Sequence, residues 1–201
     1  MTRGTHQVGA FAAAVGTLLL ARPLLAGEAT PGWPAAVGAL SLALPGGTMP
    51  WWAATVYLLA ALLGGVAPDL DKPRRLWARL LADRALGGHR HLSHSLLGLA
   101  GAAALTAALL SALSPWLPLP GGLPWLGFVT GYASHLILDT LTIEGVPWLF
   151  PWPRFVGLPP LAELRVRTGG LVEELVVVPG LLIVVGWLGY VGGTSLASLW
   201  R

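Results

Sequence analysis

The stretch Gly131-Tyr132-Ala133-Ser134-His135-Leu136-Ile137-Leu138-Asp139-Thr140-Leu141-Thr142 decides how this chain must fold, because it places a histidine and a carboxylate inside an otherwise apolar segment. His135 and Asp139 are four residues apart, so on a helix they project from the same face, one turn apart. Two ligands of one metal ion can use that spacing. Facing lipid, an ionisable pair would cost several kcal/mol. The pair is therefore expected to point into the protein and to find partners there.

The composition is typical of a membrane protein. Of the 201 residues, 55% are hydrophobic and 10% are charged, and the mean hydropathy is +0.70, whereas soluble domains carry about 25% charged residues. The sequence has no cysteine, which excludes disulfides and thiolate ligands and leaves imidazole and carboxylate for any metal. We interpret the net charge of +3 as a topology signal, and we expect no nucleic-acid partner.

Apolar segments recur along the whole chain. Five of them predict helices that cross or enter a bilayer: Val8–Leu25, Trp51–Val66, Leu96–Leu113, Trp125–Leu141 and Leu175–Val191. A shorter apolar piece, residues 35–44, predicts a re-entrant or interfacial helix. We therefore predict an all-α, polytopic membrane helical bundle with about five spans, formed by a single domain of residues 1–201. A cleaved signal peptide is the alternative for the first segment, but Arg22 and Pro23 interrupt its end.

Basic residues predict the topology. Ten of the twelve lysine and arginine residues fall in three places: Arg3, six positions from Lys72 to Arg90, and three positions from Arg154 to Arg167. If two segments cross before the second group and two more before the third, all ten lie on one side, which the positive-inside rule makes cytoplasmic. All five histidines and at least three carboxylates fall on that same predicted side. Random placement would scatter some of them to the other side.

Each polar candidate also has an interpretation without a metal. His6 alone would be an exposed residue near the start of the chain, and His135 could simply hydrogen bond with Asp139 in helix packing. Asp69 and Asp71 could cap a helix or be solvated in a loop. The remaining ordinary roles are headgroup contacts for His89 and His91, ion pairs of Glu173 with Arg165 or Arg167, and helix N-caps for Ser93 and Ser95. Convergence on one face favours a metal site over these roles.

Four motifs carry a family resemblance, and they occur in order along most of the chain. They are Thr5-His6, Pro68-Asp69-Leu70-Asp71, His89-Arg90-His91-Leu92-Ser93-His94-Ser95, and Gly131 through Val146 with the following turn Pro147–Pro151. Together they resemble the YdjM-like family of membrane-bound metal-dependent hydrolases. The resemblance implies an inner-membrane protein with a divalent metal that hydrolyses ester or phosphoester bonds. His91 departs from the pattern, since the family has a glycine there, and we leave it out of the ligand set.

The resemblance and the spacing together suggest roles for individual residues. The metal ligands we predict are His6, Asp69, His94, His135 and Asp139, with Asp71 and His89 as ligands or their neighbours, and with Glu173 at a position similar to the family's late acidic residue. Asp71 is the expected general base when it does not bind metal, and Arg90 is expected to clamp a phosphate through two hydrogen bonds. A divalent ion lowers the pKa of bound water from about 15.7 to about 7 and polarises a phosphoryl oxygen.

Zinc is the favoured ion, with manganese and iron as alternatives. The His-x-x-x-Asp spacing is similar to that of zinc-dependent phospholipase C and P1-type nucleases, which suggests more than one ion. The predicted substrate is a membrane lipid or a lipid-linked phosphoester. Two other functions stay open: a membrane-anchored regulatory or scaffold protein with a structural metal, whose basic loop Lys72 to Arg90 docks a cytoplasmic protein partner, and a small proton or metal transporter.

Overall fold

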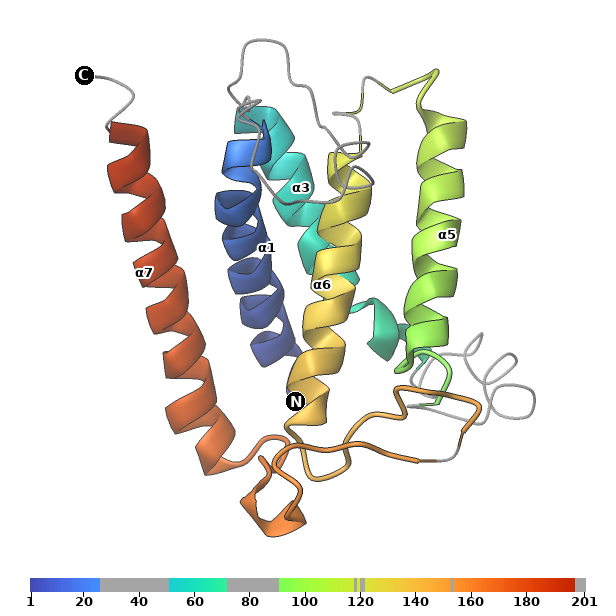
Figure 1. Ribbon diagram of the computed structural model, residues 1–201, viewed down its shortest axis with the longest axis vertical. Coiled ribbons are helices and arrows are strands. Elements are labelled where there is room, and N and C mark those ends of the chain that lie inside the picture. The colour runs from blue at the N-terminus through green and yellow to red at the C-terminus, as the bar shows by residue number, and fades with distance from the viewer. Residues whose placement is uncertain (26–50, 72–90, 118, 120–121, 153, 198–201) are drawn as a thin grey trace.

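The structure is a computed structural model that describes residues 1–25, 51–71, 91–117, 119, 122–152 and 154–197. These residues contain five α-helices (Figure 1), which are α1 (Arg3–Leu25), α3 (Trp51–Gly64), α5 (Leu96–Leu113), α6 (Leu123–Thr140) and α7 (Val178–Ala197). Three short helical turns accompany them: η1 (Ala67–Asp71), η2 (Ala162–Leu164) and the π-helical η3 (Glu173–Val177), which leads into α7. The all-α class is confirmed. The short apolar piece at 35–44 lies outside the described residues.

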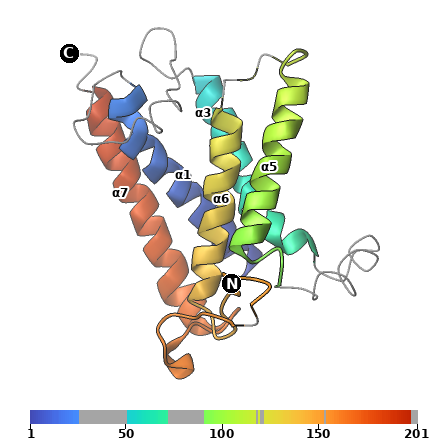
Figure 2. The ribbon, with the colours of Figure 1, turned by 45° about the vertical axis from the view of Figure 1, so that its right-hand side comes forward.

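Helix α6 is central. It packs against α1, α3 and α5, whereas α7 packs against α1, and two views show α6 between α1 and α5 (Figures 1 and 2). The chain alternates in direction, so the starts of α1, α5 and α7 meet the ends of α3 and α6 at one end of the bundle, the lower end in Figure 1. We call this end the site end. It gathers segments that are far apart in the sequence.

Glycines bring α3 and α6 into close contact. A Cβ atom added at Gly131 would lie 1.9 Å from the carbonyl oxygen of Ala61, and one added at Gly127 would lie 2.3 Å from that of Tyr57. Four residues apart on α6, the two glycines form the small-xxx-small pattern by which membrane helices approach each other closely. This approach sets Gly65, just past the end of α3, directly against α6.

The described residues support two membrane spans, and the prediction of about five spans is therefore corrected. Among the described residues, the windows Leu96–Leu113 in α5 and Glu173–Tyr190 through α7 are the two with the length and apolar composition of a span. Helix α3 has 14 residues, and at 1.5 Å per residue its length of about 21 Å is shorter than the roughly 30 Å hydrocarbon core. Helices α1 and α6 mix polar side chains into their apolar runs, because they carry the buried cluster described below.

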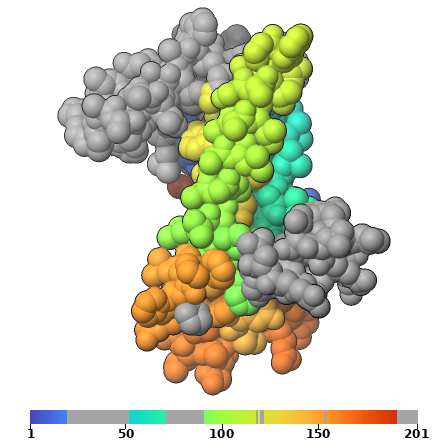
Figure 3. Space-filling model, turned by 90° about the vertical axis from the view of Figure 1, so that its right-hand side faces the viewer, coloured from blue at the N-terminus to red at the C-terminus, as the bar shows by residue number. Residues whose placement is uncertain are grey.

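The two candidate spans present apolar side chains outward. No residue of α5 is buried, and Leu105 is 62% exposed, while Ile183 on α7 is 72% exposed. In the face shown in Figure 3, α5 runs along the surface above the loop that follows α6. Outward leucine and isoleucine side chains of this kind suit contact with lipid tails.

The loop between α6 and α7 folds back under the bundle. Isolated bridges pair Thr142 with Val166 and Val146 with Val156, and the backbone N–H of Leu96 donates to the carbonyl of Trp148 (2.9 Å). The loop is thereby tied to the start of α5. Its position closes the site end of the bundle.

Two serines, Ser93 and Ser95, are predicted to be helix N-caps, and Ser95 is the N-cap of α5. The hydroxyl of Ser95 accepts a hydrogen bond from the backbone N–H of Gly98 (3.1 Å), with the extended backbone of an N-cap residue. Ser93 was also predicted to be a cap. Instead its hydroxyl lies 2.9 Å from Nδ1 of His94, because the helix starts two residues later.

Candidate metal centre

His135 is the centre of a buried polar cluster at the site end. The residue is fully buried on α6, and its Nδ1 atom lies 2.7 Å from the carbonyl oxygen of Gly65. Because a carbonyl only accepts hydrogen bonds, Nδ1 carries a proton, and in the neutral ring the lone pair is then on Nε2. A backbone carbonyl on one ring nitrogen is the usual arrangement that orients a metal-binding histidine.

The Nε2 atom of His135 faces three other potential ligand atoms. It lies 3.3 Å from Nε2 of His94, 3.6 Å from Oδ2 of Asp139 and 3.9 Å from Oδ1 of Asp69. His94 is itself 3.6 Å from Oδ2 of Asp139 and 3.8 Å from Oδ1 of Asp69. Three segments supply these atoms: the η1 turn, the residues just before α5, and α6 itself.

The separations among His94, His135 and Asp139 fit a small tetrahedral cation, and Asp69 lies beside both histidines. Ligand atoms about 2.0–2.1 Å from a tetrahedral ion are about 3.3–3.4 Å from one another, and the five distances above run from 3.3 to 3.9 Å. The donors are imidazole nitrogen and carboxylate oxygen, which suit zinc, manganese or iron. His94, His135 and Asp139 are at most 1% exposed, and the side chain of Asp69 is 9% exposed. The cluster could therefore hold a metal ion.

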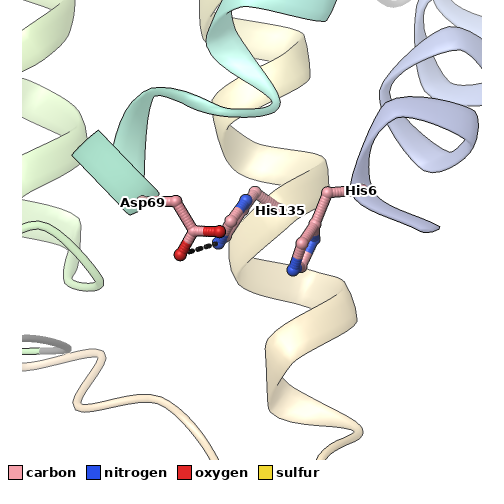
Figure 4. Close-up of side chains that lie close together, drawn as sticks. All are labelled: His6, Asp69 and His135. Carbon is pink, nitrogen blue, oxygen red and sulfur yellow. Dashed lines mark ion pairs between the residues drawn. The ribbon is translucent and has the colours of Figure 1, made fainter. Parts of the chain in front are cut away.

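His6 joins the cluster from α1. Its ring stacks on that of His135, with ring centroids 3.6 Å apart and an angle of 11° between the planes, and its Nε2 atom lies 3.2 Å from Oδ1 of Asp139. Figure 4 shows His6 and Asp69 on opposite sides of His135. The Nδ1 atom of His6 is buried and has no hydrogen-bond partner among the described residues. A buried, unsatisfied ring nitrogen is what a ligand position leaves behind.

Asp139 joins the two sides of the cluster. Its Oδ2 atom faces His94 and His135, whereas its Oδ1 atom faces His6 and lies 2.5 Å from the α-ammonium group of Met1. Two groups of three residues, His6 with Asp69 and His135, and His94 with His135 and Asp139, each bring their ligand atoms within 4.8 Å. The two groups share His135 and form one continuous cluster.

The ring of Tyr132 anchors the segment that carries His94. The Tyr132 hydroxyl donates to the carbonyl oxygen of Ser93 (2.5 Å), one residue before His94. Tyr132 lies on α6, three residues before His135, so a single helix positions two of the histidines. Sequence reasoning did not identify this contact or that of Gly65. The glycine pair on α6 was the only available signal, because it indicates close helix packing.

The structure does not bring Glu173 into the cluster. Its carboxylate accepts hydrogen bonds from Thr2, Thr5 and Gly169, and it belongs to neither group of three. His91 is half-buried and packs edge-on against Phe155, with ring centroids 5.6 Å apart.

The remaining predicted site residues cannot be placed. Asp71 ends η1, but its side chain lies outside the described residues, as do His89 and Arg90. Their roles as ligand, general base and phosphate clamp stay predictions.

Comparison with known proteins identifies relatives over much of the chain. The profile of a family described as YdjM inner membrane protein matches residues 1–193. The protein called inner membrane protein YdjM from Escherichia coli (strain K12) is 35% identical over 107 residues, which cover 50% of this chain and 50% of that protein, and the protein of that name from Shigella flexneri matches equally. The chain thus spans about half the length of the curated relatives it matches. No solved structure matches it significantly.

Proposed function

The chain belongs to the YdjM inner membrane protein family, and from this membership and the buried cluster we propose that it is a membrane-bound metal-dependent hydrolase. The reaction we propose is hydrolysis of a phosphoester in a lipid or lipid-linked substrate. The protein lies in the inner membrane, as the family and its relatives are named.

The convergence of buried imidazole and carboxylate groups carries the proposal. His94, His135 and Asp139 are almost completely buried and lie within 3.6 Å of one another. Burying such groups is costly unless opposite charge compensates: the α-ammonium group of Met1 supplies it at Oδ1 of Asp139, and a metal would supply it at Oδ2, which faces His94 and His135. Held by these residues and Asp69, a divalent cation would act as a Lewis acid toward water and toward a phosphoryl oxygen.

The chain's own residues have distinct roles in this proposal. His135 presents a lone pair of fixed orientation because Gly65 holds its other nitrogen. Asp69 is the most exposed of the four donors and the farthest from the histidines, so substrate is proposed to approach from its side. Asp71, two residues after Asp69 at the end of η1, is the proposed general base, and Arg90 is the proposed phosphate clamp.

The surroundings of the cluster support a lipid substrate. The loop between α6 and α7 carries exposed apolar side chains at the site end, including Leu149 (69% exposed), Trp152 (61%) and Leu161 (63%). Aromatic and aliphatic side chains at the end of membrane spans are typical of the interface with headgroups. A lipid phosphoester would lie at that depth. The basic residues of the same end lead us to propose that it faces the cytoplasm.

One observation favours a second candidate, a regulatory or scaffold protein with a structural metal. Structural zinc sites are filled by four protein ligands, whereas catalytic sites keep a position open. With His6, five candidate donors meet here, so protein ligands could fill all four positions, and Asp69 decides between the candidates. If Asp69 stays bound in the loaded protein, the ion has no open position, and a partner protein on the cytoplasmic side becomes the better proposal.

Metal analysis of detergent-purified protein, followed by a screen of lipid phosphomonoesters and phosphodiesters, tests the proposal. We expect a stoichiometric divalent metal, much weaker binding of it in His135→Ala and Asp139→Ala, and ester hydrolysis that depends on it. Absence of metal from the native protein would overturn the hydrolase. Metal without turnover would favour the scaffold, and metal or proton flux in liposomes would favour a transporter.

A further inference from the structure

Glu173 is the one fully buried carboxylate of the described residues that lies outside the cluster. Its Oε1 atom accepts hydrogen bonds from the backbone N–H of Thr2 (2.6 Å) and from the hydroxyl of Thr5. Its Oε2 atom accepts one from the backbone N–H of Gly169 (2.8 Å). Three donors from two distant segments therefore converge on a single carboxylate.

The contacts at Thr2 are those of a helix N-cap. The carbonyl of Thr2 accepts the first backbone hydrogen bond of α1, from the N–H of His6 (3.1 Å), and its hydroxyl lies 3.4 Å from the N–H of Thr5. In a capping box, a glutamate three residues after the cap returns to the cap's own N–H. Here that position is Thr5, whose side chain is too short, and Glu173 makes the bond from the far end of the chain.

Only a carboxylate satisfies this arrangement. All three partners of Glu173 are donors, and an ionised carboxylate is an acceptor at both oxygens. A glutamine would turn an NH₂ group toward at least one of them. The negative charge also lies at the N-terminal end of α1, where the helix dipole favours an anion.

The residue after Thr5 is His6, whose ring stacks on His135 and whose Nε2 atom faces Asp139. We propose that Glu173 is a positioning residue that caps α1 across the chain and thereby sets His6 in the metal centre, and that it is not itself a ligand. The proposal rests on the proposed metal site. It explains why both oxygens of this buried acid accept hydrogen bonds from Thr2, Thr5 and Gly169.

A double-mutant cycle on zinc affinity tests this role. Glu173→Gln is expected to weaken zinc binding about tenfold, the cost typical of losing a residue that orients a ligand. In a His6→Ala background the same change is expected to have less than a twofold effect, because no ring remains to be positioned. Glu174→Gln is the matched control, since Glu174 is exposed and adjacent, and it is expected to change nothing.

Other results of this cycle would overturn the inference. An equal loss in both backgrounds would make Glu173 a ligand or a general structural residue, and no loss in either would remove any role at the centre. If Glu173→Gln does not fold, Thr5→Val replaces it in the cycle, with Thr5→Ser as the variant expected to retain affinity because it keeps the hydroxyl donor to Glu173.

Hydrogen exchange in metal-free protein gives a second test that does not need the ion. We expect faster exchange of the first-turn amides of α1, those of Thr5 and His6, in Glu173→Gln but not in Glu174→Gln. Unchanged exchange would refute the cap. If the native protein binds no zinc, the proposed function fails while this exchange result still decides whether Glu173 caps α1.

Discussion

Helices α5 and α6 each have 18 residues and pack side by side, yet α6 is surrounded by other helices and α5 is exposed. No residue of α5 is buried, whereas most of the second half of α6 is. By length and composition α5 is a candidate membrane span, whereas α6 is not among the candidates. The helix with the less apolar sequence is thus the one that its neighbours enclose, because its polar side chains need protein partners and its glycines allow close approach.

Polar residues on the two helices differ in the same way. On α5, the hydroxyl of Thr106 donates back to the carbonyl of Ala102 (2.7 Å), so it needs no partner from another helix. On α6, His135 and Asp139 contact residues from α1, η1 and the start of α5. The first kind of polar residue is compatible with lipid. The second requires a bundle around it and, as we propose, a cation.

The largest expected effect comes from removing the central imidazole. His135→Ala should reduce zinc affinity by at least about a hundredfold, more than the loss of a residue that only orients a ligand. Thr106→Ala on α5 is the control and should leave affinity unchanged. Isothermal titration of both purified variants checks this. Equal affinities would mean that α6 and α5 do not differ in the way described.

Asp139 and Asp69 should differ in how much each contributes to zinc affinity. Asp139→Asn should weaken zinc binding by about a hundredfold, because its oxygens face three histidines. Asp69→Asn should cost only about tenfold, because Asp69 is farther from the histidines and more exposed. Competition with a chelator measures both. The reverse order would place the ion nearer η1 than α6.

The next largest expected effect is on the free energy of unfolding, and it comes from the close packing of α3 against α6. Gly131→Ala on α6 should lower the free energy of unfolding by about 1–3 kcal/mol, because the added Cβ meets the backbone of α3. Gly101→Ala on α5 meets nothing within 4 Å and should be neutral or stabilising by up to about 1 kcal/mol. Thermal unfolding in detergent compares the two. If Gly131→Ala is as stable as Gly101→Ala, the close approach of α3 and α6 is wrong.

The substitutions expected to perturb the protein least are single cysteines that report which side of the membrane each end of the bundle faces. The sequence has no cysteine, so Glu174→Cys at the site end and Ser114→Cys past the end of α5 each introduce one thiol. With α5 spanning the membrane and the site end facing the cytoplasm, an impermeant reagent should label position 114 in intact spheroplasts and position 174 only in inverted vesicles. Labelling of both from one side would show that α5 does not cross.

The sequence predicted the convergence of buried histidines and aspartates better than the number of membrane spans. The i, i+4 spacing of His135 and Asp139 requires only a helix, and the apolar surroundings require that the pair be buried. His6, Asp69 and His94 were expected on the same face, and the structure places them together. The number of spans was overestimated because an apolar helix surrounded by protein has the same composition as one surrounded by lipid. For α3, it is the length of 14 residues that distinguishes a buried helix from a membrane span.

Other details depend on contacts that no local pattern encodes. Glu173 was expected to be a ligand from its place in the sequence, but its carboxylate accepts hydrogen bonds from Thr2 and Thr5, which lie more than 160 residues away. The tautomer of His135 depends on the carbonyl of Gly65, which reaches it only because α3 and α6 pack closely. Such long-range hydrogen bonds follow from the packed fold, not from residue spacing.

X-ray absorption spectroscopy of the zinc-loaded protein tests the central claim most directly. We predict one strongly bound zinc per chain with only nitrogen and oxygen neighbours at about 2.0–2.1 Å, including at least two imidazoles, and the loss of one imidazole in His135→Ala. A zinc ion without imidazole neighbours, or an identical spectrum in His135→Ala, would contradict a metal centre built on α6.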